Sequence, residues 1–135
     1  MITRKAEYTI QILTILAEYH QNNERITTKS VAKKLNLLQN LVIQLIGNLR
    51  EKGWVESTRG PSGGIKLIKD PEEIDLKEVI ELVDGPIMIT RCLINDKPCG
   101  DKPSCHLRGI WLKAQKKMVD ELEQVTIKDL LEAKE

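Results

Sequence analysis

The sequence of 135 residues contains no phenylalanine, and its only aromatic residues are two tyrosines and two tryptophans. A hydrophobic content of 41% still supports a core, which must be built from isoleucine, leucine and valine. No run of 18 apolar residues occurs, which excludes a predicted membrane-spanning helix. Charges at Arg4, Lys5 and Glu7 leave no apolar stretch for a secretory signal. We therefore expect a cytoplasmic protein with one compact domain, or with one small domain and an appendage.

Cysteine is absent from the first 91 residues and then occurs three times, at Cys92, Cys99 and Cys105. An odd number argues against a closed disulfide framework. Zinc sites usually begin with about two to four intervening residues, and these gaps are wider. The wider gaps favour an iron–sulfur cluster, which needs soft thiolate ligands, but they leave zinc and a thiol redox switch open. His106 is the nearest candidate fourth ligand, although side chains of adjacent residues diverge.

The charge is distributed unevenly along the chain. Residues 1–70 carry 11 basic and 6 acidic residues, a net charge of +5. Residues 71–135 carry 10 and 14, a net charge of −4. The basic half is consistent with a polyanionic partner, or with a solvated charged surface.

Three helices are predicted in the basic half. Residues 3–20 carry two apolar stripes, which indicates burial on both sides, within one subunit or between subunits. Residues 28–35 form a short helix, capped by Thr27 or Thr28 and ended by Asn36.

The third helix begins at Leu37 or Leu38, runs to about Lys52 and stops at Gly53. Its predicted inner face contains apolar residues one turn apart, namely Leu38, Val42, Leu45 and Leu49. A short helix and a longer one joined by a tight turn form a helix-turn-helix.

The outer face of the third helix carries amides. Asn40, Gln44 and Asn48 are spaced one turn apart, with Gln39 beside them. Amides donate and accept hydrogen bonds together, as recognition of base edges in the major groove requires. An ordinary solvated face is the alternative, although such faces more often carry lysine and glutamate.

Two short strands, Trp54–Thr58 and Ile65–Ile68, flank a glycine-rich turn and predict a hairpin, or wing. Arg59 at its tip is suited to a minor groove, and the turn glycines allow close approach to phosphates. A nucleotide-binding loop is disfavoured, because no Gly-Lys-Ser/Thr sequence or following helix is present.

The fold class predicted from these elements is mainly α (α+β). A winged helix-turn-helix domain spans residues 1–86 and includes a fourth helix with a capping box formed by Asp75 and Glu78. A cysteine loop spans 87–106. Residues 107–135 contain a long amphipathic helix, predicted over 107–124, and a last short helix. The long helix needs a partner surface, and the simplest is a second copy of the chain. An enzyme is not expected, because no Ser-His-Asp or Cys-His arrangement is apparent.

Several sequence segments resemble the Rrf-two (Rrf2) family of bacterial winged-helix regulators, over nearly the whole chain. The segments that carry the resemblance are Lys5–Tyr8, Leu49–Val55, Arg59–Gly64, Asp70–Ile74 and Val83–Pro86. The resemblance implies a homodimer on a palindromic double-stranded DNA operator. It also implies base contacts from the third helix and a minor-groove contact from Arg59. The residues expected at DNA are Gln39, Asn40, Gln44, Asn48, Arg59, Gly60, Ser62, Thr28 and Lys29.

The resemblance further implies that the three cysteines hold an iron–sulfur cluster, 2Fe–2S or 4Fe–4S, that responds to nitric oxide, redox state or cluster supply. Some family members use a histidine three residues beyond the last cysteine, where this chain has Arg108. Nitric-oxide sensors of the family use an acid in the first helix of the other subunit, and Glu7 falls on that position. Glu7 is therefore the preferred fourth ligand and His106 the alternative. The competing hypothesis keeps the same DNA-binding frame but switches it by thiol oxidation or zinc.

Overall fold

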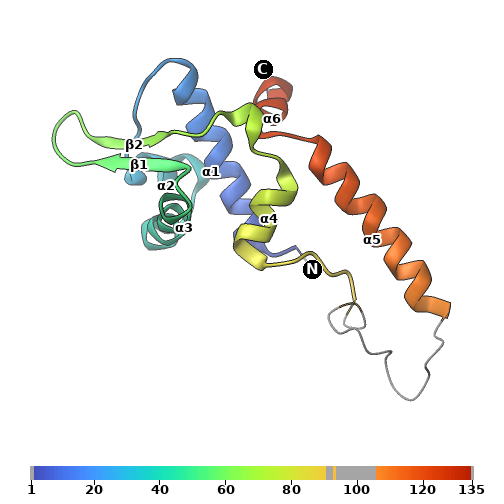
Figure 1. Cartoon of the computed structure of the whole chain (residues 1–135). Coiled ribbons are helices and arrows are strands. Elements are labelled where there is room, and N and C mark those ends of the chain that lie inside the picture. The colour runs from blue at the N-terminus through green and yellow to red at the C-terminus, as the bar shows by residue number, and fades with distance from the viewer. Residues whose placement is uncertain (1, 91–92, 94–105, 135) are drawn as a thin grey trace.

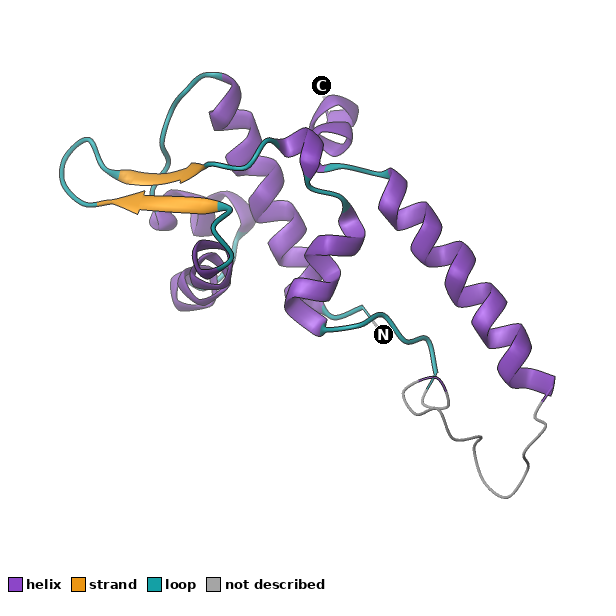
Figure 2. Ribbon diagram, viewed as in Figure 1, coloured by secondary structure: helices purple, strands orange, loops and turns teal. Residues whose placement is uncertain are grey.

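The computed structural model describes residues 2–90, 93 and 106–134, in which helices dominate and the strands form one hairpin (Figure 2). The wing, α2 and α3 lie at one side of the molecule, and α5 lies at the other (Figure 1). In chain order the elements are α1 (Arg4–Gln21), α2 (Thr28–Leu35), α3 (Gln39–Glu51), β1 (Val55–Thr58), β2 (Gly64–Leu67), the 3-10 turn η1 (Pro71–Glu73), α4 (Leu76–Asp84), α5 (His106–Gln124) and α6 (Ile127–Lys134).

The first helix forms the centre of the fold. Thr3 caps α1, with its side chain accepting a hydrogen bond from the Ala6 amide at 3.3 Å. Both predicted stripes contribute to burial, because α1 packs against α4 and α6 as well as α2, α3 and β2. Leu13 from one predicted stripe and Ile12 from the other are wholly buried in the main core, and this confirms the predicted apolar faces.

Capping residues fix the two ends of α2, the first helix of the helix-turn-helix. Thr27 accepts a hydrogen bond from the Ser30 amide and begins α2. Asn36 ends it with a φ of 55°, in the left-handed conformation that asparagine tolerates. Both predicted caps of this helix are therefore confirmed.

The start of α3 corrects one prediction. Leu38 was expected on the inner face but is 80% exposed. It is the extended N-cap residue, with a ψ of 135°, so it precedes the helical repeat that aims side chains at the core. The observed inner face instead includes Ile46, and its members are Val42, Leu45, Ile46 and Leu49.

The wing is an antiparallel hairpin in which Val55 pairs with Leu67 and Thr58 with Gly64. A single further bridge extends it, because the amide of Ile65 donates to the Ile26 carbonyl at 2.7 Å. The turn requires a glycine at Gly63. A Cβ there would lie 2.2 Å from the Thr58 carbonyl oxygen.

The last helix returns to the main core. Ile127 and Leu131 of α6 are buried in the same cluster as the α1 side chains. A bridge between Asp75 and Thr126 joins the start of α4 to the residue before α6. Thr126 and Asp129 form a capping box, with side chains and amides bonded reciprocally at 2.9 and 3.2 Å.

The long helix α5 packs along only part of its length. Met118 and Leu122 in its C-terminal half contact a second small core, whose buried members are Ala6, Ile80 and Ile87. Near its N-terminal end, Leu107 and Ile110 are 55% and 57% exposed. None of the described helices is long and apolar enough to cross a membrane.

Candidate nucleic-acid interface and cysteine segment

The exposed face of α3 presents unpaired amides. Gln39, Asn40 and Gln44 are exposed, while Asn48 is half-buried. In the part of the chain that the structure describes, none of these four side chains makes a hydrogen bond. The buried apolar face of α3 anchors them on a rigid helix. Their donors and acceptors are therefore available to an external partner.

The wing extends beside this face. Arg59, Gly60 and Ser62 are exposed at its tip, and Gly60 has a φ of 105° that favours glycine. Arg50 near the end of α3 donates to the Ser57 hydroxyl of β1 at 3.1 Å. This bond links the C-terminal end of α3 to the wing.

The start of α2 faces the wing across a groove of about 280 Å³. Hydroxyl groups of Thr27, Thr28 and Ser57 and the glycines of the wing turn contribute to its lining. Lys29 is exposed next to Thr28. The residues predicted at DNA on α2, α3 and the wing are thus carried by neighbouring elements (Figure 1).

The first turn of α1 carries Glu7, which is exposed. This end of the helix is tied to the end of α4. Both the amide and the hydroxyl of Thr3 donate to the carboxylate of Asp84, the amide at 3.0 Å. Sequence reasoning did not assign this clamp, although Asp84 lies in one of the segments that carry the family resemblance.

The start of the cysteine segment lies against the same end of α1. Ile87 is buried with Ala6 and Ile80, and the amide of Ile89 donates to the side chain of Gln115 at 3.1 Å. Leu93 is also buried. The structure therefore brings the beginning of the loop close to the helix that carries Glu7.

The predicted cysteine ligands Cys92, Cys99 and Cys105 lie outside the described residues. His106 is the exposed first residue of α5. Within residues 2–90, 93 and 106–134, no group of three or more histidine, cysteine, aspartate or glutamate side chains is placed to hold a metal ion.

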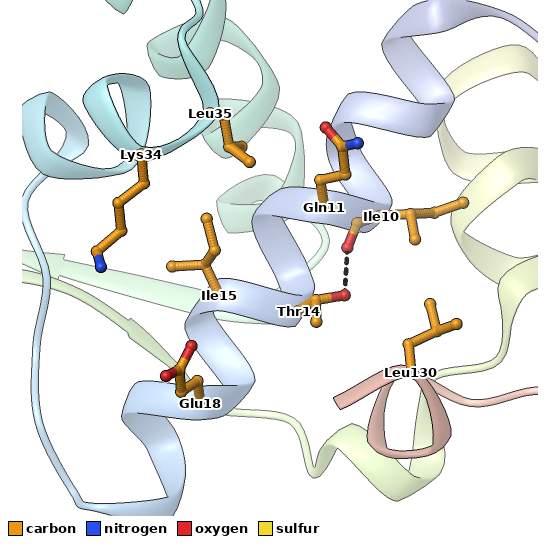
Figure 3. Close-up of a pocket in the computed structure, with 8 residues that line it drawn as sticks. All are labelled: Ile10, Gln11, Thr14, Ile15, Glu18, Lys34, Leu35 and Leu130. Atoms are coloured by element: carbon orange, nitrogen blue, oxygen red, sulfur yellow. Dashed lines mark hydrogen bonds between the residues drawn. The ribbon is translucent and has the colours of Figure 1, made fainter. Parts of the chain in front are cut away.

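A separate cavity of about 520 Å³ lies on the outer side of α1, between α2 and α6 (Figure 3). Its walls are mainly apolar, including Ile10, Leu35 and Leu130. The Thr14 hydroxyl donates to the Ile10 carbonyl at 2.9 Å, and Lys34 lies over the Tyr19 ring at 5.9 Å. The Thr14 hydroxyl and the Lys34 ammonium are thus engaged within the chain, and the cavity lies apart from the exposed face of α3.

Comparison with known proteins decides the family. The model of the Rrf2 family, described as iron-dependent transcriptional regulators, matches residues 2–133. The chain belongs to the Rrf2 family. It is 31% identical to the HTH-type transcriptional regulator NsrR of Bacillus licheniformis over 131 residues, which cover 96% of this chain and 91% of that protein.

Two solved Rrf2 structures share the fold. The structure of CymR, the global cysteine regulator of Bacillus subtilis, superposes with a TM-score of 0.84 at 27% identity. That match covers 98% of this chain and 97% of CymR. The IscR of T. potens gives a TM-score of 0.80 at 25% identity, covering 100% of this chain and 88% of that one. The predicted fold class, mainly α with a small sheet, is confirmed.

Proposed function

We propose that this Rrf2 protein is a cytoplasmic, DNA-binding transcription regulator that acts as a homodimer on a palindromic operator and performs no catalysis. The observation that carries the proposal is the exposed amide face of α3 beside the wing. The inner face of α3 is fixed in the main core, so its outer face is a rigid, preorganised surface. Such a helix fits the major groove, where donors and acceptors distinguish the base pairs.

The four amide side chains lie at successive positions along α3 and are expected to contact different base pairs. Gln39 and Asn40 lie in the first turn of α3, the part of a recognition helix that reaches base edges. Gln44 follows one turn after Asn40, and the half-buried Asn48 lies one turn beyond Gln44. A glutamine or asparagine side chain makes a bidentate pair with adenine through its amide.

The surrounding residues position the helix on the duplex. Arg59 at the wing tip enters the adjacent minor groove, where a narrow A·T-rich groove has a strong negative potential. Thr28 and Lys29 at the start of α2, with Gly60 and Ser62 on the wing, contact phosphates. Contacts of this kind fix register but carry no sequence information.

The dimer is formed by the exposed stripe of α5. Leu107, Ile110 and Trp111 are exposed large apolar residues within one turn of this helix. A contiguous apolar patch of this kind marks a protein interface. A second copy offers the same stripe across a two-fold axis, which gives two reading helices and an operator of two inverted half-sites.

The cysteine segment is the sensor. Cys92, Cys99 and Cys105 would hold an iron–sulfur cluster, with Glu7 of the partner subunit as fourth ligand and His106 as the alternative. The donor set fits this group, since three thiolates are the ligands such clusters require. The carboxylate is a harder and weaker ligand. When bound, the cluster would supply an iron centre that reacts with nitric oxide or changes its redox state. A shortage of cluster would leave the site unfilled.

The described residues offer a route from the sensor to the reading helix. Ile87 at the start of the loop packs on Ala6 of α1, and the clamp between Thr3 and Asp84 joins α1 to the end of α4. In the main core, α1 also contacts α3, the helix that carries the amides. A shift of the loop therefore displaces α1 and, through it, the spacing of the two reading helices.

Anaerobic purification tests the sensor. The wild type should be brown, with iron and acid-labile sulfide in stoichiometric amounts. Cys99→Ser should lose the colour, and Glu7→Ala should keep less cluster or lose it faster in air. His106→Ala is the matched control, because it should affect the cluster only if His106, and not Glu7, is the fourth ligand. A colourless wild type without sulfide contradicts the cluster.

A second candidate retains the DNA-binding frame but uses zinc or thiol oxidation as the switch. It is favoured by the similarity to CymR of Staphylococcus aureus, one solved structure of which is an oxidized form that matches almost the full chain. Stoichiometric zinc in a colourless protein supports the zinc switch. A change in DNA affinity on mild oxidation, absent from a variant with all three cysteines replaced by serine, supports the other.

A further inference from the structure

Within the exposed face of α3, Ile43 and Gly47 form a strip that differs from its polar surroundings. The two residues lie one turn apart on the same side of the helix. Asn40 and Gln44 lie on one flank of the strip, and Arg50 lies on the other, by the angular repeat of an α-helix. The strip therefore runs along the middle of the surface assigned to DNA reading.

Ile43 is the one large apolar side chain of α3 that is left exposed, at 47%. All of α3 lies in the described part of the chain. Its other large apolar side chains are buried or partly buried in the main core. The described chain leaves nearly half of the Ile43 surface uncovered, so the fold does not account for an apolar residue among amides.

Gly47 is equally unexplained by the fold. It lies inside α3, where glycine destabilises a helix relative to alanine. Its φ is not in the positive region, and a Cβ built on it would meet nothing within 4 Å. Neither backbone conformation nor packing within the chain requires a glycine here. A close external surface would account for the glycine, because a helix without a side chain at this position can approach that surface more closely.

We propose that Ile43 packs against the C5-methyl group of a thymine in each half-site, and that Gly47 allows the close approach this contact needs. The inference rests on the proposed function. The thymine methyl is the apolar group displayed on the floor of the major groove, where polar base edges otherwise dominate. An apolar side chain between amides matches a methyl group between donors and acceptors.

The test begins with an operator selected by the wild-type chain and replaces each thymine singly by uracil, which deletes only the methyl group. At one thymine or more in each half-site, we expect the wild type to lose roughly fourfold in affinity, as for burial of one methyl group. Ile43→Ala should lose affinity for the thymine operator and bind thymine and uracil DNA equally. A wild type indifferent to every replacement overturns the methyl contact, as does an Ile43→Ala variant that keeps the sensitivity.

Gly47→Ala tests the close approach. We expect about a tenfold loss of operator affinity together with a rise in Tm of roughly 2–5 °C, since alanine favours the helix. The matched control is Gly109→Ala on α5, where a Cβ also meets nothing within 4 Å. Gly109 lies away from Leu107 and Trp111 on the helical wheel, so this change should raise Tm without altering affinity. Wild-type affinity in Gly47→Ala overturns the close approach. A wild type that selects no operator overturns the proposed function as well.

Discussion

The helices α3 and α5 are both amphipathic but leave opposite chemistries exposed. α3 buries its apolar face in the main core and presents amides such as Gln44 to solvent. α5 contains no buried residue and leaves Ile110 57% exposed. An amide surface suits a partner with hydrogen-bonding edges, whereas an apolar surface suits an apolar partner. The comparison teaches that the chain has two incomplete surfaces, which we assign to DNA and to a second copy.

The largest effect on the free energy of unfolding is expected when a side chain on the buried side of α3 is truncated. Leu49→Ala should lower the free energy of unfolding by about 2–5 kcal/mol, because Leu49 is wholly buried and its truncation leaves a cavity. Leu38→Ala is the matched control, since the same change at an 80% exposed position should cost less than about 0.5 kcal/mol. Denaturant titration measures both values. Equal losses would contradict the assigned orientation of the helix.

The next prediction concerns the exposed stripe of α5. Ile110→Asp should raise the dissociation constant of the dimer by roughly 30-fold or more, since an unpaired carboxylate would be buried at the centre of the seam. Sedimentation equilibrium measures the change. Lys116→Asp introduces the same residue at a 77% exposed side chain on the opposite side of the helix and should have a much smaller effect. A dimer insensitive to Ile110→Asp would remove α5 from the interface.

A smaller effect is expected on the reading face of α3. Gln44→Ala should cost about 1–3 kcal/mol on the operator and little on random DNA, because a lost base contact matters only at the matching base. Lys29→Ala should weaken both complexes to a similar extent and reduce the salt dependence, as for a phosphate contact. Fluorescence anisotropy on the two DNAs compares these variants. Equal losses on both DNAs for Gln44→Ala would exclude it as a base reader.

The smallest effect concerns pH and the bridge between α4 and α5. A hydrogen bond from Lys77 to Glu123, at 2.8 Å, raises the pKa of the Lys77 ammonium above its ordinary value of 10.5. The folded state therefore holds this proton more tightly, so the stabilisation is present below pH 10.5 and is lost as pH rises through the folded pKa. Thermal melts between pH 8 and alkaline pH should show a slight extra loss of Tm in the wild type relative to Lys77→Met. High salt should shrink the difference, because the pair is exposed.

Local chemistry made much of the fold predictable from the sequence. Caps are short-range signals, so Thr27, Asn36 and Asp75 marked helix ends that the structure confirms. The exposed position of Leu38 was missed because an N-cap residue looks like part of the repeat until its backbone conformation is known. The amides of α3 were found from their spacing alone.

Long-range pairing was not predictable in the same way. The packing of Ile127 into the main core and the bridge from Ile26 to the wing join segments far apart in the chain. A local pattern shows that an apolar face needs a partner but not which one. The same applies to the clamp between Thr3 and Asp84, whose two residues are separated by most of the winged domain. The roles of the cysteines stay predictions.

Selection of bound fragments from random or genomic DNA tests the central claim most directly. The account predicts that the wild-type dimer enriches two inverted half-sites whose centres are about 10 base pairs, or a multiple of that spacing, apart. The double variant with Gln44→Ala and Arg59→Ala should retain salt-dependent binding but lose the enrichment. Absence of any enriched sequence for the wild type, with and without its metal or cluster, would contradict the account.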